Sequence, residues 1–126
     1  MPNQMETKLP ESELEVMLVL WKHSQPIRTA QIMAEIPKDW MQSTVKALLA
    51  RLTEKGFVEV TREGRFTLYR ALVAEQDYRR RETQGLVQRY YQNSVKNMVA
   101  ALVNEGDLTQ QDLAELEEMI QNAGRK

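Results

Sequence analysis

Small polar and basic side chains share one face of the segment 42–55. If this segment forms a helix of 3.6 residues per turn, its apolar side comprises Val45, Leu48, Leu49 and Leu52. The opposite side has short side chains near its start and long cations at its edges. This shape suits a helix in the DNA major groove, because bulky side chains would hold the helix backbone away from the bases. An ordinary solvated helix face is the alternative interpretation. The candidate DNA contacts are Gln42, Ser43 and Thr44 for base edges, Ala47 on the same face, and Lys46, Arg51 and Lys55 for phosphates.

Two β-rich runs follow this helix. Residues 57–61 and 66–70 alternate with a period near two, and Gly64 between them can adopt the positive φ of a hairpin turn. Arg62 and Arg65 bracket this glycine and could contact phosphates or a narrow minor groove. The alternative is a charged hairpin end that prevents association of sheet edges.

The preceding elements complete the fold that would position these side chains. Apolar periodicity predicts helices over 10–23 and 29–36, the first of them buried on all sides, and Pro37 stops the second. Three short helices followed directly by a β-hairpin are the order of a winged helix-turn-helix domain. We therefore expect a mainly α fold with a small β-hairpin wing (α+β), with the DNA-binding domain over residues 1–73.

The remaining residues, 74–126, are predicted to be helical. A long helix over 74–92 and an amphipathic segment over 95–106 precede a last helix, for which Thr109 is a good N-cap with Asp112 three residues later. Amphipathic helices without strands must bury their apolar stripes either against the first domain or against a second copy of themselves. The stripe residues are Tyr78, Leu86, Tyr90, Val95, Met98, Val99, Leu102, Leu113, Leu116 and Ile120.

The charge of the chain is polarised along its length. The total of 17 Lys and Arg against 18 Asp and Glu gives −1, which by itself argues against a nucleic-acid partner. Residues 41–70, however, hold six cations against three anions, and residues 95–126 hold three cations against six anions. The first segment is therefore suited to phosphate and the second to protein. The run Arg79-Arg80-Arg81 allows three interpretations: a solvated helix face, pairing with the acidic tail across a dimer, or contact with flanking DNA.

Several functional classes are disfavoured by composition. With one His and no Cys, the chain has no disulfide, no thiolate nucleophile and no Cys-ligated metal site. We see no nucleophile, base or metal constellation and expect neither an enzyme nor a cofactor. The longest apolar run, residues 16–21, is far short of the roughly 20 residues that span a bilayer, and the N-terminus does not resemble a signal peptide. A cytoplasmic protein without membrane insertion is the default expectation.

Several groups of residues follow one another along the chain in a specific order. The first groups are Glu13-Leu14-Glu15-Val16-Met17 with Leu20-Trp21, then Trp40, Ser43-Thr44-Val45-Lys46-Ala47-Leu48-Leu49 and Arg51-Leu52-Thr53-Glu54-Lys55-Gly56. The later groups are Gly64-Arg65-Phe66-Thr67-Leu68-Tyr69 and Asp107-Leu108-Thr109 with Leu113-Ala114-Glu115-Leu116. Together they cover nearly the whole chain and resemble the BlaI/MecI penicillinase repressor family of winged-helix regulators.

The resemblance implies a homodimeric transcriptional repressor. Its recognition helix would read a palindromic double-stranded DNA operator, and its C-terminal helices would interlock with those of the partner through the stripe residues. The resemblance also implies control by a membrane sensor protease that triggers cleavage in the C-terminal part, as in β-lactamase-type regulation of antibiotic resistance. The alternative function is a winged-helix protein-interaction module that does not bind specific DNA.

The chain departs from the family pattern at three places. Some relatives respond to copper through Cys-x-Cys pairs, and this chain has no Cys. The bond equivalent to the family's Asn-Phe cleavage site is Ala101-Leu102. A hydroxyl residue often opens the second and third helices in the family, whereas Arg28 and Met41 occupy these positions here.

Overall fold

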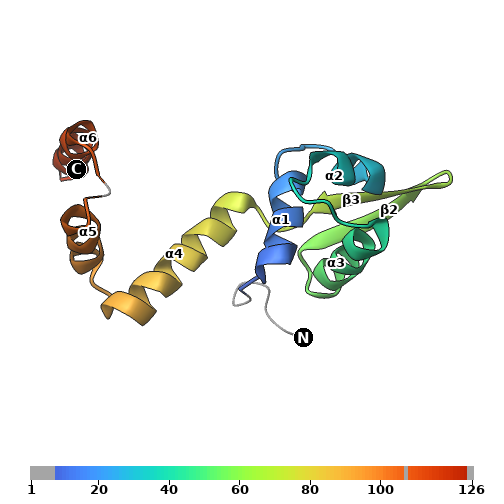
Figure 1. Ribbon diagram of the computed structural model, residues 1–126, viewed down its shortest axis with the longest axis horizontal. Helices are drawn as coiled ribbons and strands as arrows, with labels where there is room; N and C mark the ends of the chain where they lie inside the picture. The colour runs from blue at the N-terminus through green and yellow to red at the C-terminus, as the bar shows by residue number, and fades with distance from the viewer. Residues whose placement is uncertain (1–7, 107, 125–126) are drawn as a thin grey trace. The chain divides into compact units, whose positions relative to one another are not determined.

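A computed structural model describes residues 8–106 and 108–124 of the chain (Figure 1). Its elements are α1 (Glu11–Leu20), β1 (Ile27–Arg28), α2 (Thr29–Glu35), α3 (Gln42–Glu54), β2 (Val58–Glu63), β3 (Phe66–Ala71), α4 (Glu75–Tyr91), α5 (Val95–Asn104) and α6 (Gln110–Ala123). The chain forms two compact units, which we call unit 1, up to Glu82, and unit 2, from Thr83. The division falls inside α4, whereas the sequence places a boundary before this helix, at 73/74.

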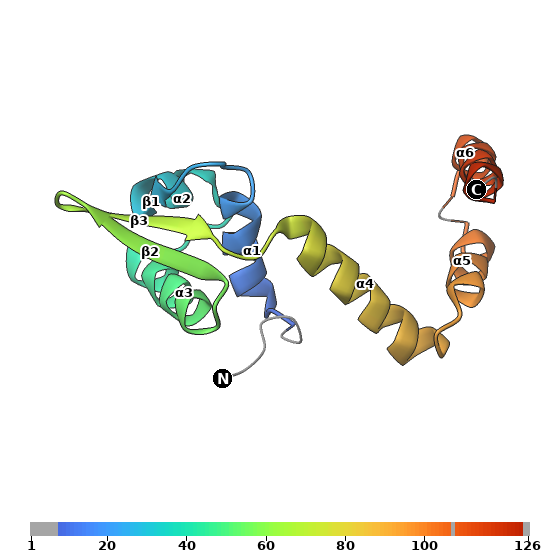
Figure 2. The same cartoon turned by 180° about the vertical axis from the view of Figure 1, so that it is seen from behind.

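Unit 1 combines three helices with a three-stranded antiparallel sheet in the order β1-β3-β2 (Figure 2). The predicted hairpin is formed by β2 and β3, and its strands extend to the pair Glu63 and Phe66. The turn between them therefore has only two residues, and Gly64 at its first position has φ +64°, as a type II′ hairpin turn requires. The sequence did not predict β1, because a two-residue strand has no period that can be detected.

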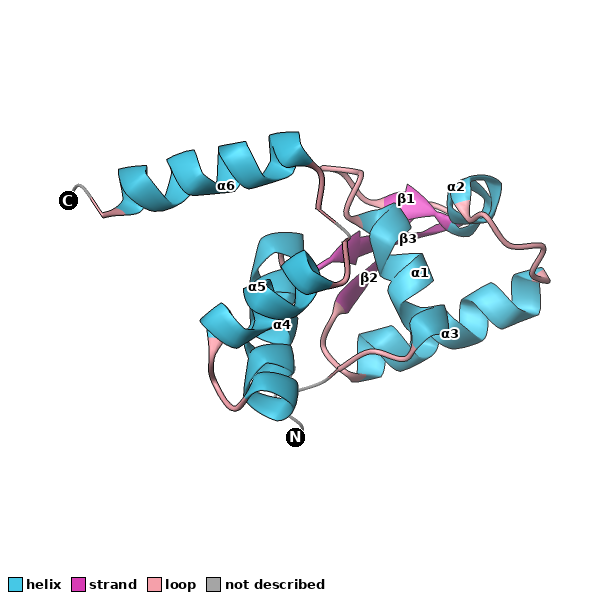
Figure 3. Cartoon of the chain, turned by 60° about the vertical axis from the view of Figure 1, so that its left-hand side comes forward, coloured by secondary structure: helices cyan, strands magenta, loops and turns pink. Residues whose placement is uncertain are grey.

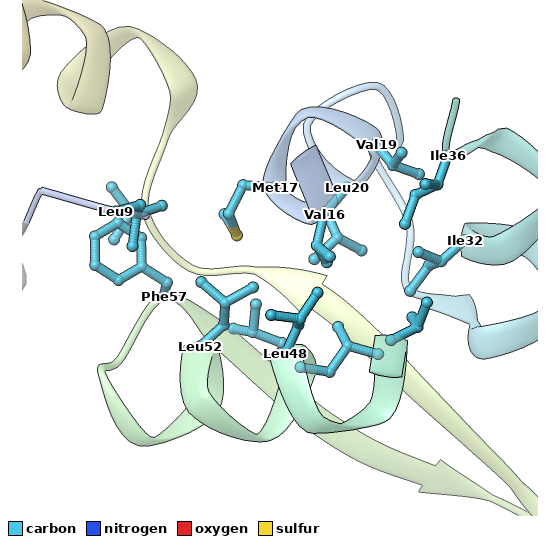
Figure 4. Close-up of a cluster of buried hydrophobic side chains, with 14 of the residues drawn as sticks. Leu9, Val16, Met17, Val19, Leu20, Ile32, Ile36, Leu48, Leu52 and Phe57 are labelled. Carbon is cyan, nitrogen blue, oxygen red and sulfur yellow. The ribbon is translucent and has the colours of Figure 1, made fainter. Parts of the chain in front are cut away.

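The three helices meet the sheet in one hydrophobic core (Figure 4). Leu48 and Leu52 point from α3 toward α1, and the periodic side of α3 is buried as predicted. Phe57, directly after α3, is fully buried. The prediction that the first helix is buried on all sides is wrong at Leu18, which is 39% exposed.

The end of α3 and the start of the hairpin are joined by a tight turn. Gly56 has φ +85°, a conformation that costs a residue with a Cβ more than it costs glycine. The backbone N–H of Phe57 then donates to the Leu52 carbonyl at 2.9 Å, which closes the helix end. This turn fixes where β2 begins relative to α3.

Unit 2 contains the second part of α4 together with α5 and α6. The predicted N-cap of the last helix is confirmed: Thr109 accepts a hydrogen bond from the Asp112 backbone N–H at 3.0 Å, and the Asp112 carboxylate accepts one from the Thr109 N–H at 3.1 Å. Among the described residues of α5 and α6, none is buried. The expectation that Leu113, Leu116 and Ile120 are buried is therefore not met within one chain: the two leucines are half-buried, and Ile120 is 68% exposed.

Within the described residues, none of the helices combines the length and the apolar character needed to cross a bilayer.

Candidate nucleic-acid interface

The exposed face of α3 carries the polar residues that the sequence singles out. Ser43, Thr44 and Ala47 are exposed, and Val45 and Leu48 on the opposite side anchor the helix in the core. Figure 3 shows α3 alongside α1 and the sheet in unit 1. Gln42, Lys46 and Arg51 are also exposed on this helix. The first turn of α3 has no acidic residue, so that its partly positive N-terminal end is not neutralised locally.

Lys55 makes an ion pair that the sequence did not predict. Its Nζ lies 2.5 Å from Oε1 of Glu13, whose side chain is only 3% exposed. Because the lysine compensates a buried carboxylate of α1, its ammonium is held on the side of α3 that faces the core. We therefore propose that Lys55 stabilises the fold and that the phosphate contacts of α3 come from Lys46 and Arg51. The sequence could not reveal this, because the partner is 42 residues away.

The wing brings one of its two predicted arginines to α3. Arg65, Gln42 and Lys46 line one hollow of about 390 Å³ at the junction of the wing with the starts of α2 and α3. Arg62 is exposed on β2, opposite Thr67, and does not line this hollow. The structure thus places Arg65 with the recognition-helix candidates and leaves Arg62 further along the hairpin.

The hollow is also lined by residues that the sequence did not single out as candidate DNA contacts. Its remaining lining is formed by Arg28, Thr29, Ala30, Phe66, Thr67 and Tyr69. Among the described residues, no Asp or Glu lines it. The one sequence signal for Arg28 was its place at the opening of α2, where the family often has a hydroxyl residue. Its proximity to the wing depends on β1, which pairs Arg28 with Leu68.

Ion pairs elsewhere reduce the charge that is available for DNA. Arg70 on β3 pairs with Glu59 on β2 at 2.6 Å. In α4, Arg79 pairs with Glu75 at 2.7 Å and Arg80 lies 3.7 Å from Asp77, both within the same helix. These local contacts agree best with a solvated helix face for Arg79 and Arg80. Lys46 and Arg51 on α3 and Arg62 and Arg65 on the wing remain exposed.

The predicted dimer residues fall into different environments. Tyr78 is buried in the core of unit 1, where its ring lies 5.7 Å from Trp21 and 5.8 Å from Phe57. It is therefore not available to a partner chain, and we remove it from the proposed dimer surface. Five residues are exposed on α4, α5 and α6: Leu86, Tyr90, Val95, Leu102 and Ile120. Four others are half-buried: Met98, Val99, Leu113 and Leu116.

Comparison with known proteins agrees with this architecture. The family model described as "Penicillinase repressor" matches residues 9–122. The chain is 30% identical to a penicillinase repressor of Bacillus licheniformis, with 90% of each chain covered. It is 27% identical to the methicillin resistance regulatory protein MecI of Staphylococcus aureus strain N315, covering 90% of this chain and 93% of the relative.

A solved structure supports the assignment of the fold. The DNA-binding domain of the repressor BlaI is 35% identical, with a TM-score of 0.53, over 62% of this chain and 94% of that domain. The motifs, the three helices with their wing and the match over most of the chain lead to one assignment. The chain belongs to the penicillinase repressor family, which is a family of transcriptional repressors and not of enzymes.

Proposed function

We propose that the protein is a homodimeric, sequence-specific DNA-binding repressor of a palindromic operator. The observation that carries this proposal is the exposed face of α3, where Gln42, Ser43 and Thr44 stand beside Lys46 with no acidic residue in the first turn. Short polar side chains let the helix backbone approach base edges, and the flanking cations supply contacts to phosphate. The similarity to the DNA-binding domain of the repressor BlaI supports DNA as the partner of unit 1.

The proposed dimer uses unit 2. Its apolar residues Leu86, Tyr90 and Val95 are exposed in the single chain, together with Leu102 and Ile120. Burying such residues against a second copy gains roughly 25 cal/mol for each Å² of apolar surface removed from water. A two-fold dimer would place one α3 in each of two major grooves about 34 Å apart, and so would match a palindromic operator. Repression would follow from occupation of a promoter.

The proposal extends to derepression through unit 2 by signalled proteolysis from a membrane sensor protease. The position of the family's cleavage bond, Ala101-Leu102, lies within α5. The Ala101 carbonyl accepts a helical hydrogen bond from the Glu105 N–H at 3.0 Å. Because proteolysis generally requires local opening of the backbone, cleavage here would need α5 to unwind first. Limited proteolysis with mapping of the cut sites would test whether this bond is cleaved.

Duplex binding measured against salt tests the DNA-binding proposal. We expect a palindromic duplex obtained by binding-site selection to bind the full chain as a 2:1 complex. With about six phosphate contacts per dimer, log K should fall with log [salt] at a slope of about −5. Replacing Ser43 or Thr44 with Ala should change the selected base preference, whereas Ser24→Ala, in the loop after α1, should not.

Two other outcomes would contradict the proposal in whole or in part. If no duplex is selected and a protein partner binds without salt dependence, the winged helix is a protein-interaction module and the proposal is wrong. If duplex binding is retained but unit 2 does not dimerise, only the dimeric part of the proposal is wrong. Analytical ultracentrifugation of the full chain separates these cases.

A further inference from the structure

Three cations from three elements surround the hollow in unit 1. Arg28 comes from the start of α2, Lys46 from the exposed face of α3 and Arg65 from the wing tip. Among the described residues, the lining of this hollow contains no carboxylate, and Glu63 belongs to a neighbouring hollow that Arg28 and Phe66 also line. Mutual repulsion of three cations around one hollow is relieved when an anion enters. The arrangement is therefore that of an anion-binding site.

Arg28 is held at this site by an aromatic ring. Its guanidinium carbon lies 4.5 Å from the centroid of the Phe66 ring, and that of Arg65 lies 5.7 Å from the same ring. Phe66 is 45% exposed at the start of β3, so that its ring is accessible to these cations. The attraction between a cation and the face of an aromatic ring restrains the Arg28 guanidinium beside the hollow. Planar, oriented guanidinium groups are well matched to phosphate oxygens.

The position of Arg28 in α2 points to the same role. Arg28 is the N-cap residue of α2, and no side-chain hydrogen bond caps this helix. A Ser, Thr, Asp or Asn at such a position typically stabilises a helix by accepting a hydrogen bond from a backbone N–H of its first turn. The chain has a long cation there instead, directed to the wing and not to the backbone of α2. The N-cap position of α2 therefore carries a side chain that lines the hollow and does not cap the helix.

We propose that this hollow binds one phosphodiester group of the operator backbone, with Arg28 as its additional contact. The inference rests on the proposed function and adds a contact from the start of α2 to those proposed for α3 and the wing. Gln42 and Lys46 line the hollow and belong to the exposed face of α3. A phosphate seated here therefore lies on the strand next to the groove that α3 enters. It fixes the register of the protein on the duplex without reading its sequence.

Single-site neutralisation of the operator backbone tests the contact. Methylphosphonate groups are placed one at a time along the selected duplex, and affinity is measured for the full-length wild type and for Arg28→Ala. We expect one position per half-site to weaken the wild type about tenfold and to weaken Arg28→Ala clearly less, because the variant has already lost one of the three cations around this phosphate. Arg28→Ala should also lower the salt slope by about one for each half-site, with unchanged base preference.

Matched variants separate charge, geometry and folding. Arg28→Lys keeps the charge and should restore part of the affinity, and Phe66→Leu removes the supporting ring and should weaken binding in the same direction. Arg70→Ala is the control, because Arg70 on β3 pairs with Glu59 and does not line the hollow. Each methylphosphonate should weaken DNA binding by this variant as much as it weakens binding by the wild type. Thermal unfolding should be nearly unchanged in Arg28→Ala, because the Arg28 side chain is exposed.

A titration without DNA adds an independent readout. Inorganic phosphate at millimolar concentration should shift the backbone amide signals around residues 28–30, 42–46 and 65–67, and Arg28→Ala should reduce the shifts at equal phosphate concentration. If phosphate shifts these signals but every methylphosphonate affects Arg28→Ala as it affects the wild type, the hollow binds an adventitious anion only and the inference is wrong. If the wild type binds no duplex, the proposed function fails and this inference fails with it.

Discussion

Tyr78 joins three segments of unit 1 through a single side chain. Its hydroxyl oxygen accepts a hydrogen bond from the Leu9 backbone N–H at 2.9 Å, and its ring packs against Trp21 and Phe57. Trp21 in turn donates from Nε1 to the Val73 carbonyl at 2.8 Å. These contacts tie the segment before α1, the end of α1 and the first turn of α4 to the winged-helix core. The phenol is only 9% exposed, and its titration therefore reports on this junction.

We expect this junction to weaken at alkaline pH. Burial raises the pKa of Tyr78 above 10.0; the hydrogen bond from Leu9 opposes the rise, and the negative charge of Glu82 adds to it. Because the folded pKa exceeds the unfolded pKa, the contribution is fully present below about pH 10 and is lost as pH rises through the folded pKa. Urea unfolding between pH 8 and 11 should show a shallower loss of stability in Tyr78→Phe than in the wild type. Equal pH slopes would contradict this account.

Residue roles could be predicted from sequence where they follow from local periodicity. The exposure of Ser43 and Thr44 follows from the helical spacing of the apolar residues around them. Roles that depend on distant partners could not be predicted in this way. Lys55 is turned inward by Glu13, 42 residues earlier, and Tyr78 is fixed by Leu9, 69 residues earlier. Arg28 joins the candidate site only because β1 pairs with β3.

At the scale of elements, α3 is positioned by its buried side and by the hairpin that follows it. Leu49 and Leu52 are fully buried on its inner side, and Phe57 continues this contact into the hairpin. Helix boundaries in unit 1 could be predicted to within a few residues, because apolar periodicity and Pro37 mark them. β2 extends to Glu63, two residues further toward the turn than predicted, whereas β3 begins at Phe66 as predicted, because cross-strand pairing and not composition decides where a hairpin ends. Periodicity also could not show which stripes of unit 2 remain exposed.

The ion pair between α1 and α3 should be an important stabilising contact. Replacing Lys55 with Met leaves the buried Glu13 carboxylate without its charge partner, and we expect a loss of about 3 kcal/mol in the free energy of unfolding. Lys46→Met, an exposed substitution in the same helix, should change it by less than about 0.5 kcal/mol. Urea denaturation of the two variants provides the comparison.

The same two variants should behave in the opposite way toward DNA. Under conditions where both are folded, Lys46→Met should lower the salt slope of duplex binding and Lys55→Met should retain it. A stable Lys55→Met variant with a reduced salt slope would show that Lys55 contacts phosphate after all, and that the ion pair with Glu13 is dispensable.

At the scale of the whole molecule, the net charge of −1 conceals an uneven distribution of charge between the two units. Several cations of unit 1 lie on α3, at the hollow and on the wing, whereas unit 2 combines exposed apolar residues with an excess of acidic ones. Negative charge in unit 2 disfavours contact with phosphate, and its exposed apolar residues favour a protein partner. DNA affinity would then depend on dimerisation, because linking two half-site contacts converts the second binding event into an intramolecular one.

Two fragments of different length test where the DNA-binding unit ends. A fragment of residues 1–82 retains Tyr78 and its contacts with Trp21 and Phe57, whereas a fragment of residues 1–73 lacks them. Loss of a buried aromatic side chain typically costs about 3 kcal/mol or more, so that the longer fragment should be the more stable by roughly this amount. Tyr78→Ala in the longer fragment should remove most of the difference, as measured by urea denaturation.

The oligomeric state of the longer fragment then tests the role of unit 2. Fragment 1–82 should sediment as a monomer and bind a half-site with the salt slope of one protomer, while the full chain sediments as a dimer and binds the palindrome far more tightly. Equal stability of the two fragments would place the boundary at 73/74, where the sequence alone predicts it. A stable dimer of fragment 1–82 would move the dimer surface out of unit 2. The exposed apolar residues of unit 2 would then not be covered by a second copy of the chain, so that result would also require a different binding partner for them.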